Sequence, residues 1–287
     1  TGCTMDSPRQ KLPTQMQILS YALMVLVVVI VGLPLLWMIL GSLKTNQEIY
    51  SMPTRWLPSA PRWDNFADAW NAAPFGQFYI NSIIITIAGA GLKVVNATMT
   101  AYAFAFLRFP GKNWLFLLLL AALMIPEQVA ILPNYLTLAN VFGQSWINTY
   151  QGIVLPGAAT AFGTFLMRQS FLSLPREVLD AAKVDGCGHL RLLWDIVLPL
   201  SRPVLATMTL IFVVDRWNDY LWPLIVTNTQ MMRPLTVGLT YLFDQEGNTR
   251  WGPVMAASIF VIAPLLVIFA WAQRHIIEGI AAGATKG

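Results

Sequence analysis

The sequence predicts an all-α polytopic membrane protein with six transmembrane helices, and three observations lead to this prediction. Of its 287 residues, 56% are hydrophobic and only 11% are charged. A soluble domain of this size would then have too little polar surface to cover itself. Apolar runs long enough to cross a bilayer recur along the chain. The basic residues also gather in alternate loops, which indicates one fixed orientation in the membrane.

The first apolar run, 18–40, predicts an uncleaved first span, because a signal peptide would be shorter and would end in a small-residue cleavage site. Pro34 is compatible with it, since membrane helices accept kinks. The stretch 45–78 that follows is rich in Pro and Trp, which suits the headgroup layer. Within it, residues 63–72 predict a short amphipathic helix.

Five further spans are predicted, and they cover residues 79–107, 113–134, 147–170, 201–226 and 253–273. The second span contains Lys93, and a lysine so deep in apolar sequence is costly unless it is paired, hydrated or able to reach the interface. The glycines and alanines of the fourth span indicate close helix packing.

Six spans place both termini on one side of the membrane. Most basic residues share that side with the loop between the fourth and fifth spans. The positive-inside rule therefore predicts that both termini and this loop are cytoplasmic. The expected segments are a cytoplasmic N-terminal segment, 1–16, a six-span membrane domain, 17–273, and a cytoplasmic tail, 274–287.

The loop 173–199 is polar and charged within an otherwise apolar sequence. A helix is predicted to begin near Ser173, with Glu177 and Asp180 early in it, where negative charge suits the helix dipole. Gly186 is expected to end this helix with a positive φ.

One face of that predicted helix carries Val178, Ala181, Ala182 and Asp185 at helical spacing. The two adjacent alanines make the face flat, so another surface can approach closely. A second helical stretch, 189–197, is expected to end at the following proline.

The loop resembles the EAA loop of ABC importer permeases, E-A-A-x3-G-x9-I-x-L-P. The matching residues are Asp180 in the glutamate position, Ala181, Ala182, Gly186, Ile196, Leu198 and Pro199. The stretches LPREVLDAAKVDG and LPLSRPVLAT are similar to the carbohydrate-uptake branch of that family. The resemblance runs from about residue 17 to the C-terminus. Within the branch, FGTFLMRQSFLSLP, RWNDYLWPL and EGNTRWGPVMAA are similar to permeases of sn-glycerol-3-phosphate and glycerophosphodiester importers.

This resemblance implies a permease subunit that works in the bacterial cytoplasmic membrane. Its expected partners are a second homologous permease, two ATPase subunits, an extracytoplasmic substrate-binding protein and the lipid bilayer. The resemblance also implies that the loop docks on an ATPase subunit and transmits its movement to the spans. The expected ATPase-coupling residues are Glu177, Asp180, Ala181, Ala182, Asp185 and Gly186. Aspartate in place of glutamate shortens the acid by one methylene and alters the partner contact.

No motif for catalysis is present in the sequence. Gly111-Lys112 lacks the earlier glycine and the following Ser or Thr of a phosphate-cradling loop, and neither GxSxG nor HExxH occurs. Cys3 and Cys187 have no metal-ligand spacing, so no metal site is expected. The net charge of +4 is spread along loops, which does not indicate nucleic-acid binding. The chain is predicted to be a non-enzyme without a cofactor of its own, ATP being bound by the partner subunits.

Polar residues inside the spans predict a substrate pathway, because ionisable groups in a membrane are functional candidates. The candidates are Arg216, Trp217, Asn218, Asp219, Tyr220, Glu127 and Gln128. Two interpretations of Arg216 remain open: it meets a substrate phosphate through charge-assisted bonds, or it is neutralised by Asp219 one helical turn away. Trp217 and Tyr220 are aromatic groups suited to stacking on a polyol or choline group.

The outer segment 241–251 resembles the periplasmic loop with which the family reaches into the docked binding protein. Its candidate contact residues are Glu246, Asn248 and Arg250. Three alternatives remain: the same architecture importing a neutral, maltose- or trehalose-like sugar, a stand-alone secondary transporter or channel, and a membrane scaffold without a transport role. The secondary transporter would require inverted repeats, and none is clear in the sequence.

Overall fold

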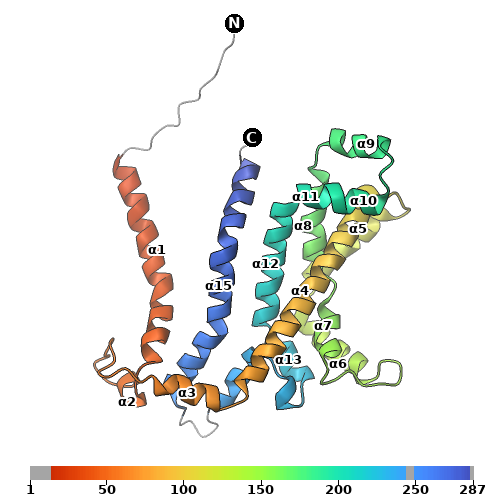
Figure 1. Cartoon of the computed structure of the whole chain (residues 1–287). Coiled ribbons are helices and arrows are strands. Elements are labelled where there is room, and N and C mark those ends of the chain that lie inside the picture. The colour runs from red at the N-terminus through yellow and green to blue at the C-terminus, as the bar shows by residue number, and fades with distance from the viewer. Residues whose placement is uncertain (1–13, 244–248, 285–287) are drawn as a thin grey trace. The chain divides into compact units, whose positions relative to one another are not determined.

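Figure 1 shows a computed structural model of the chain, which describes residues 14–243 and 249–284. Within these ranges the regular structure is helical, apart from one isolated bridge between Val141 and Gln144. The all-α prediction is therefore confirmed for the described residues. The predictions for Glu246 and Asn248 lie outside them. The chain divides into two compact units, Thr1–Ala69 with Asp244–Ile259 and Trp70–Phe243 with Phe260–Gly287.

The first unit contains α1 (Thr14–Gly41), α2 (Asn46–Ile49), the first part of α3 (Asp64–Asn71) and the first part of α15 (Trp251–Ala284). The side-chain amide of Asn46 accepts a hydrogen bond from the backbone N–H of Trp251, at 2.9 Å. The amide of Asn65 donates to the carbonyls of Ser42 and Lys44 at 2.8 and 3.0 Å. These bonds fix the polar end of α1, whereas its apolar side chains are exposed along most of its length.

The second unit is built around α4 (Phe75–Phe106), which packs against α8 (Ala161–Leu172) and α12 (Arg202–Asn218). Its other helices are α5 (Lys112–Ala121), α6 (Ile131–Ala139), α7 (Tyr150–Val154), α9 (Arg176–Val184), α10 (His189–Leu192), α11 (Leu198–Leu200), α13 (Leu221–Val226), α14 (Leu235–Gly238) and the remainder of α15. Short 3-10 or π-helical turns join them: η1 (Ala122–Met124), η2 (Glu127–Ala130), η3 (Leu155–Gly157), η4 (Leu193–Val197), η5 (Gln230–Met232) and η6 (Leu239–Leu242). In Figure 1, α9 and α10 lie at one end of this unit and α13 at the other.

Three described helices are long and apolar enough to cross a membrane: Gln15–Gly41, Phe75–Phe106 and Trp251–Ala270. Two bent pairs raise the number to five if each pair is one span. These positions agree with the expected first, second and sixth spans. The residues predicted as an amphipathic helix, 63–72, form α3.

The expected third span, 113–134, is not one straight helix. It bends by 95° between Met124 and Glu127. Pro126 has no N–H to donate, and it forces the preceding Ile125 into an extended conformation with ψ 118°. The helix therefore stops there and resumes in a new direction.

The expected fourth and fifth spans are also interrupted. The fourth, 147–170, consists of α7, η3 and α8, with irregular backbone after Pro156. The fifth, 201–226, consists of α12 and α13, with a break at Asp219 and Tyr220. These breaks matter for the site, because irregular backbone at membrane depth is tolerated only where protein covers it or where it lines a water-filled cavity.

Close packing at the centre of the second unit depends on a small residue of α8. A Cβ atom on Gly163 would lie 2.6 Å from Phe212 Cζ of α12 and 2.9 Å from Ala97 Cβ of α4. Three helices therefore meet at a point where only hydrogen fits. This confirms the packing role expected for the small residues of the fourth span.

A Gly163→Ala substitution should lower the stability of the protein by roughly 1–3 kcal/mol, because the added methyl group overpacks the contact. The matched control is Gly91→Ala in α4, where an added Cβ meets nothing within 4 Å. Unfolding of both variants in detergent micelles by a denaturing surfactant measures the difference. Equal stability of the two variants would contradict the packing role of Gly163.

Candidate functional site

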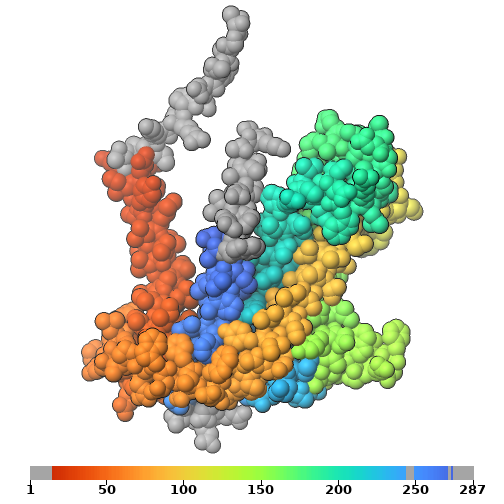
Figure 2. All heavy atoms as spheres, in the orientation of Figure 1, coloured from red at the N-terminus to blue at the C-terminus, as the bar shows by residue number. Residues whose placement is uncertain are grey.

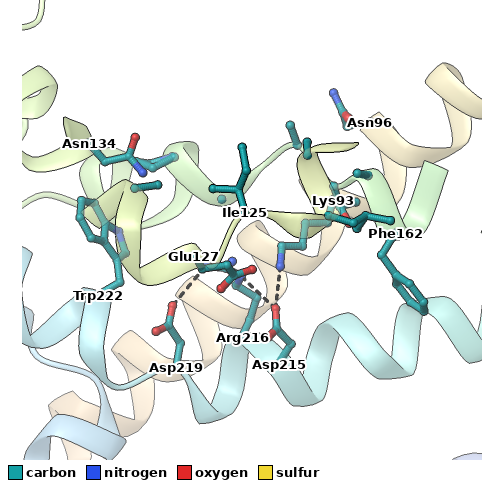
Figure 3. Close-up of a pocket in the computed structure, with 18 of the residues that line it drawn as sticks. Lys93, Asn96, Ile125, Glu127, Asn134, Phe162, Asp215, Arg216, Asp219 and Trp222 are labelled. Carbon is teal, nitrogen blue, oxygen red and sulfur yellow. Dashed lines mark hydrogen bonds and ion pairs between the residues drawn. The ribbon is translucent and has the colours of Figure 1, made fainter. Parts of the chain in front are cut away.

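The second unit contains a cavity of about 830 Å³ that is lined by charged and polar groups as well as apolar ones. Residues at three helix breaks line it: Ile125 and Glu127, Pro156 and Gly157, and Asp219 with Tyr220. α4 and α12 supply the remaining charged groups of the wall. Figure 3 shows that these side chains come from several elements and converge on one space.

Four of the charged groups form a connected cluster. Lys93 Nζ of α4 donates to Asp215 Oδ2 of α12 at 2.6 Å. Arg216 Nη1 donates to Asp219 Oδ2 at 3.2 Å, and Arg216 Nε lies 3.7 Å from the shared Asp215 Oδ2. Figure 3 marks these ion pairs with dashed lines. The lysine that the sequence left without an explanation is therefore paired across two helices.

Two glycines form the slot in which Arg216 lies. A Cβ atom on Gly157 would be 2.5 Å from Arg216 Nη2, and one on Gly89 would be 3.0 Å from Arg216 Cδ. The arginine is consequently packed between backbones and is 9% exposed. Its Nε has no hydrogen-bond partner among the described residues.

The structure brings together most of the residues that the sequence assigned to a pathway. Six of the seven line the cavity: Arg216, Asn218, Asp219, Tyr220, Glu127 and Gln128. Trp217 does not line it, since its indole N–H donates to the carbonyl of Val261 at 2.9 Å and its side chain is buried. The ion pair between Arg216 and Asp219 shows that the neutralisation considered from the sequence is present.

Sequence reasoning missed Asp215 and Trp222, which also line the cavity. The signal for Asp215 was the unexplained Lys93, because a deep lysine requires a carboxylate somewhere in the fold. Nothing in the sequence pointed to Trp222, whose indole N–H donates to the carbonyls of Gly152 and Ile153. Among the residues that the structure describes, no group of three His, Cys, Asp or Glu side chains has an arrangement suited to a metal ion.

The loop 173–199, called here the coupling segment, forms α9, α10, η4 and α11. α9 begins at Arg176 with Pro175 as its N-cap, whereas Ser173 is the C-cap of α8. The prediction that Ser173 caps the start of this helix was therefore wrong, because its backbone still completes the preceding helix.

The expected flat face of α9 is divided in the structure. Ala182 and Leu179 are buried in the hydrophobic core of the second unit, whereas Val178 and Ala181 are exposed. The two inward residues are three apart, and Val178 and Ala181 lie at the edge of the exposed surface. The rest of that surface is mainly charged, with Glu177, Asp180 and Lys183 exposed. Figure 2 shows the coupling segment protruding at its end of the second unit.

Gly186 has a φ of 75°, which confirms the expected left-handed end of α9. The second helical stretch begins at His189 as predicted, but it continues through Pro199 to Leu200. The chain then turns by 86° into α12. The coupling segment is thus joined directly to the helix that carries Arg216.

Two polar contacts fix and shape this segment. The hydroxyl of Tyr102, buried in α4, lies 3.0 Å from His189 Nδ1 of α10. On the exposed side, Lys183 Nζ donates to Asp180 Oδ1 at 2.8 Å, and this bond holds the pKa of Asp180 below its ordinary value.

Arg250 lies in the first unit, where it forms an ion pair with Asp68.

The cavity ion pair predicts a measurable coupling between Lys93 and Asp215. Lys93→Met and Asp215→Asn should each destabilise the protein, since each leaves a charged group without its partner. The double variant should recover part of the loss, with a coupling of roughly 0.5–3 kcal/mol in surfactant-induced unfolding.

The control cycle uses Arg191 and Asp195, a pair in the coupling segment whose side chains are 74% and 62% exposed. Its coupling should be close to zero, because solvent screens an exposed pair. Additive effects at Lys93 and Asp215 would show that their contact contributes nothing.

Comparison with known proteins shows which family the chain resembles. Residues 93–281 match the model of the "Binding-protein-dependent transport system inner membrane component" family. The chain is 33% identical over 272 residues to the sn-glycerol-3-phosphate transport system permease protein UgpE of Yersinia enterocolitica, covering 92% of this chain and 96% of that protein. It is 32% identical over 275 residues to the UgpE protein of Brucella abortus, covering 92% of this chain and 95% of that protein.

Two solved structures share the fold. One is a bacterial ABC transporter involved in the import of alginate, with a TM-score of 0.78, 21% identity, and coverage of 96% of this chain and 99% of that chain. The other is a bacterial alginate ABC transporter in complex with its pentasaccharide-bound periplasmic protein, with a TM-score of 0.63, 14% identity, and coverage of 91% and 94%.

The family match covers most of the chain, and the relatives match nearly all of it. These relatives are transport permeases and not enzymes, which agrees with the absence of catalytic motifs from the sequence. The apolar helices agree with a multi-pass location in the inner membrane. The chain therefore belongs to the binding-protein-dependent transport system inner membrane components, and it is a non-catalytic permease subunit of an ABC importer.

Proposed function

We propose that this permease imports sn-glycerol-3-phosphate or a glycerophosphodiester such as glycerophosphocholine. The cavity at the three helix breaks carries the proposal, because ionisable groups gathered within apolar helices are candidates for a substrate path. Similarity over nearly the whole chain to sn-glycerol-3-phosphate permeases supports the cargo class.

The working complex would contain a second homologous permease, two ATPase subunits and an extracytoplasmic binding protein. The last of these agrees with the family description and with the related complex that contains a periplasmic protein. Six spans with cytoplasmic termini would divide the chain into the segments 1–16, 17–273 and 274–287. The distribution of basic residues supports this topology, with α7 and α8 together forming the fourth span.

Within the cavity, Arg216 would approach the phosphate group and Tyr220 would stack on the polyol or choline part of the cargo. Glu127, Gln128 and Asn218 would hydrogen-bond its hydroxyl groups. The position of these residues on the cavity wall supports the roles. Trp217 is left out, because its indole is already bonded to Val261.

The exposed side of α9 would dock on an ATPase subunit through Asp180 and Ala181, with Glu177 and Asp185 at its ends. All four residues are exposed, which supports this assignment. Ala182 and Gly186 would act from the inside, the first by packing and the second by shaping the turn. Arg250, with Glu246 and Asn248 outside the described residues, would contact the binding protein.

A neutral sugar is the second candidate cargo. It is favoured by one observation: the more exposed charges of the cavity are carboxylates, which bind hydroxyl groups well. Membership of the ABC importer permeases removes the stand-alone secondary transporter and the passive scaffold from consideration.

The deciding experiment is the ATPase activity of the reconstituted complex with its binding protein, titrated with candidate cargoes. We expect stimulation by sn-glycerol-3-phosphate or glycerophosphocholine and none by maltose or trehalose. Stimulation by a neutral sugar alone would leave the assignment as a permease unchanged, and it would show that the cargo is a neutral sugar. Failure of any ATPase to co-purify with the chain would contradict the proposed complex.

A second prediction tests the coupling segment. Gly186→Val should abolish uptake while ATP hydrolysis continues, because a β-branched residue at a φ of 75° is strained and shifts α9. The control is Gly188→Ala, whose φ is −68° and whose added Cβ meets nothing within 4 Å. Parallel assays of uptake and hydrolysis compare the two, and normal uptake by Gly186→Val would count against the coupling role.

A further inference from the structure

The charged groups of the cavity are arranged by depth. The side chains of Lys93 and Arg216 are 7% and 9% exposed, whereas that of Asp215 is 47% exposed. Glu127, on η2 across the space, is exposed as well. The cations therefore lie in the wall, with Asp219 only 20% exposed beside them, whereas Asp215 and Glu127 lie nearer the space that a cargo would occupy.

The charges of the cavity do not balance. Its charged lining consists of two cations, Lys93 and Arg216, and three carboxylates, Asp215, Asp219 and Glu127. Lys93 pairs with Asp215 and Arg216 pairs with Asp219. Among the described residues, Glu127 has neither an ion pair nor a hydrogen bond within reach. The lining carries a net charge of −1, and Glu127 is its unpaired member.

One buried donor in the same wall still lacks an acceptor. Arg216 Nε has no hydrogen-bond partner in the described part of the chain, although the side chain is nine-tenths buried. The nearest carboxylate oxygen, Asp215 Oδ2, is 3.7 Å away, too far for a hydrogen bond. Nε is covered by the surrounding protein, so it adds no accessible donor to the surface that a cargo would meet.

Gly157 and Gly89 confine the side chain of Arg216. A Cβ atom added to Gly157 or Gly89 would lie 2.5 Å from Nη2 or 3.0 Å from Cδ, so only glycine leaves room for the arginine at these two positions. The guanidinium is therefore held in place, and its positive charge is largely cancelled by Asp219 and Asp215. The charged groups that a cargo would meet first are therefore the carboxylates of Asp215 and Glu127.

We propose that the cavity selects its cargo by charge, with Glu127 as the residue that disfavours phosphomonoester dianions relative to singly charged phosphodiesters. This inference rests on the proposed function and adds a specificity determinant to it. A dianion is repelled by the extra carboxylate about twice as strongly as a monoanion, and a low-dielectric surrounding enlarges the difference. The hydroxyl groups of either cargo remain able to donate to Glu127 and Asp215.

The experiment is uptake by the complete complex in proteoliposomes, with sn-glycerol-3-phosphate and glycerophosphoglycerol, a diester without a cationic head group, as competing cargoes. One unaltered binding protein serves all samples, so any change in the ratio of the two uptake rates originates in the permease. Glu127→Gln is the test variant, because it keeps the shape and removes the charge. Asp64→Asn is the matched control, since Asp64 lies on α3 in the first unit with its side chain 78% exposed.

We expect Glu127→Gln to raise the ratio of monoester to diester uptake about tenfold, and Asp64→Asn to leave it unchanged. Acidification supplies a second readout, because the second ionisation of a phosphomonoester has a pKa of about 6. Wild-type uptake of the monoester should rise relative to the diester between pH 7.5 and pH 5.5. The other charged groups that face Glu127 are Lys93, Asp215, Arg216 and Asp219, and they are unchanged in the variant. The pH effect should therefore shrink in Glu127→Gln.

An unchanged ratio in Glu127→Gln, with both cargoes still imported, would overturn charge selection and leave the proposed function standing. Loss of both uptake activities only in the variant would also overturn it, because Glu127 would then be required for transport of any cargo. If the wild-type complex imported neither cargo, the proposed function would fail, and the inference with it.

Discussion

The ion-pair cluster of Lys93, Asp215, Arg216 and Asp219 is the interaction on which the rest of the second unit depends. Charged groups within apolar helices are costly unless each has a partner, so the pairing fixes how α4 and α12 face one another. The fit of Arg216 in turn requires a glycine on α4 and another at the break before α8. The same residues thus determine both how the helices pack and which groups line the cavity, so a substitution among them affects both.

The helix breaks follow from the same physics. Backbone groups released from a helix need a partner, and lipid offers none. In this chain the interruptions after Ile125, after Pro156 and at Asp219 all border one cavity. Water or cargo in that space can satisfy the released N–H and C=O groups. The three interrupted helices therefore all contribute to the wall of the cavity.

Composition and spacing were sufficient to predict the helical class, the positions of the long apolar helices and the positive φ of Gly186, because each depends on local chemistry. The bend at Pro126 was visible as a proline, but its 95° angle depends on packing. The partner of Lys93 lies 122 residues away, and the rotation that turns Trp217 towards Val261 depends on how α12 packs. Periodicity within one helix carries no information about such distant contacts.

α4 connects the cavity to the coupling segment along a single rigid element. Lys93 and Tyr102 are nine residues apart, about 14 Å along the axis and two and a half turns, so they face opposite sides of the helix. Between them, Ala97 packs beside Gly163, where an added Cβ on the glycine would lie 2.9 Å from Ala97 Cβ. One helix therefore carries both the lysine of the cavity and the tyrosine that contacts His189 of the coupling segment, on either side of that packing point. A change in the tilt of α4 would displace both ends of this connection at once.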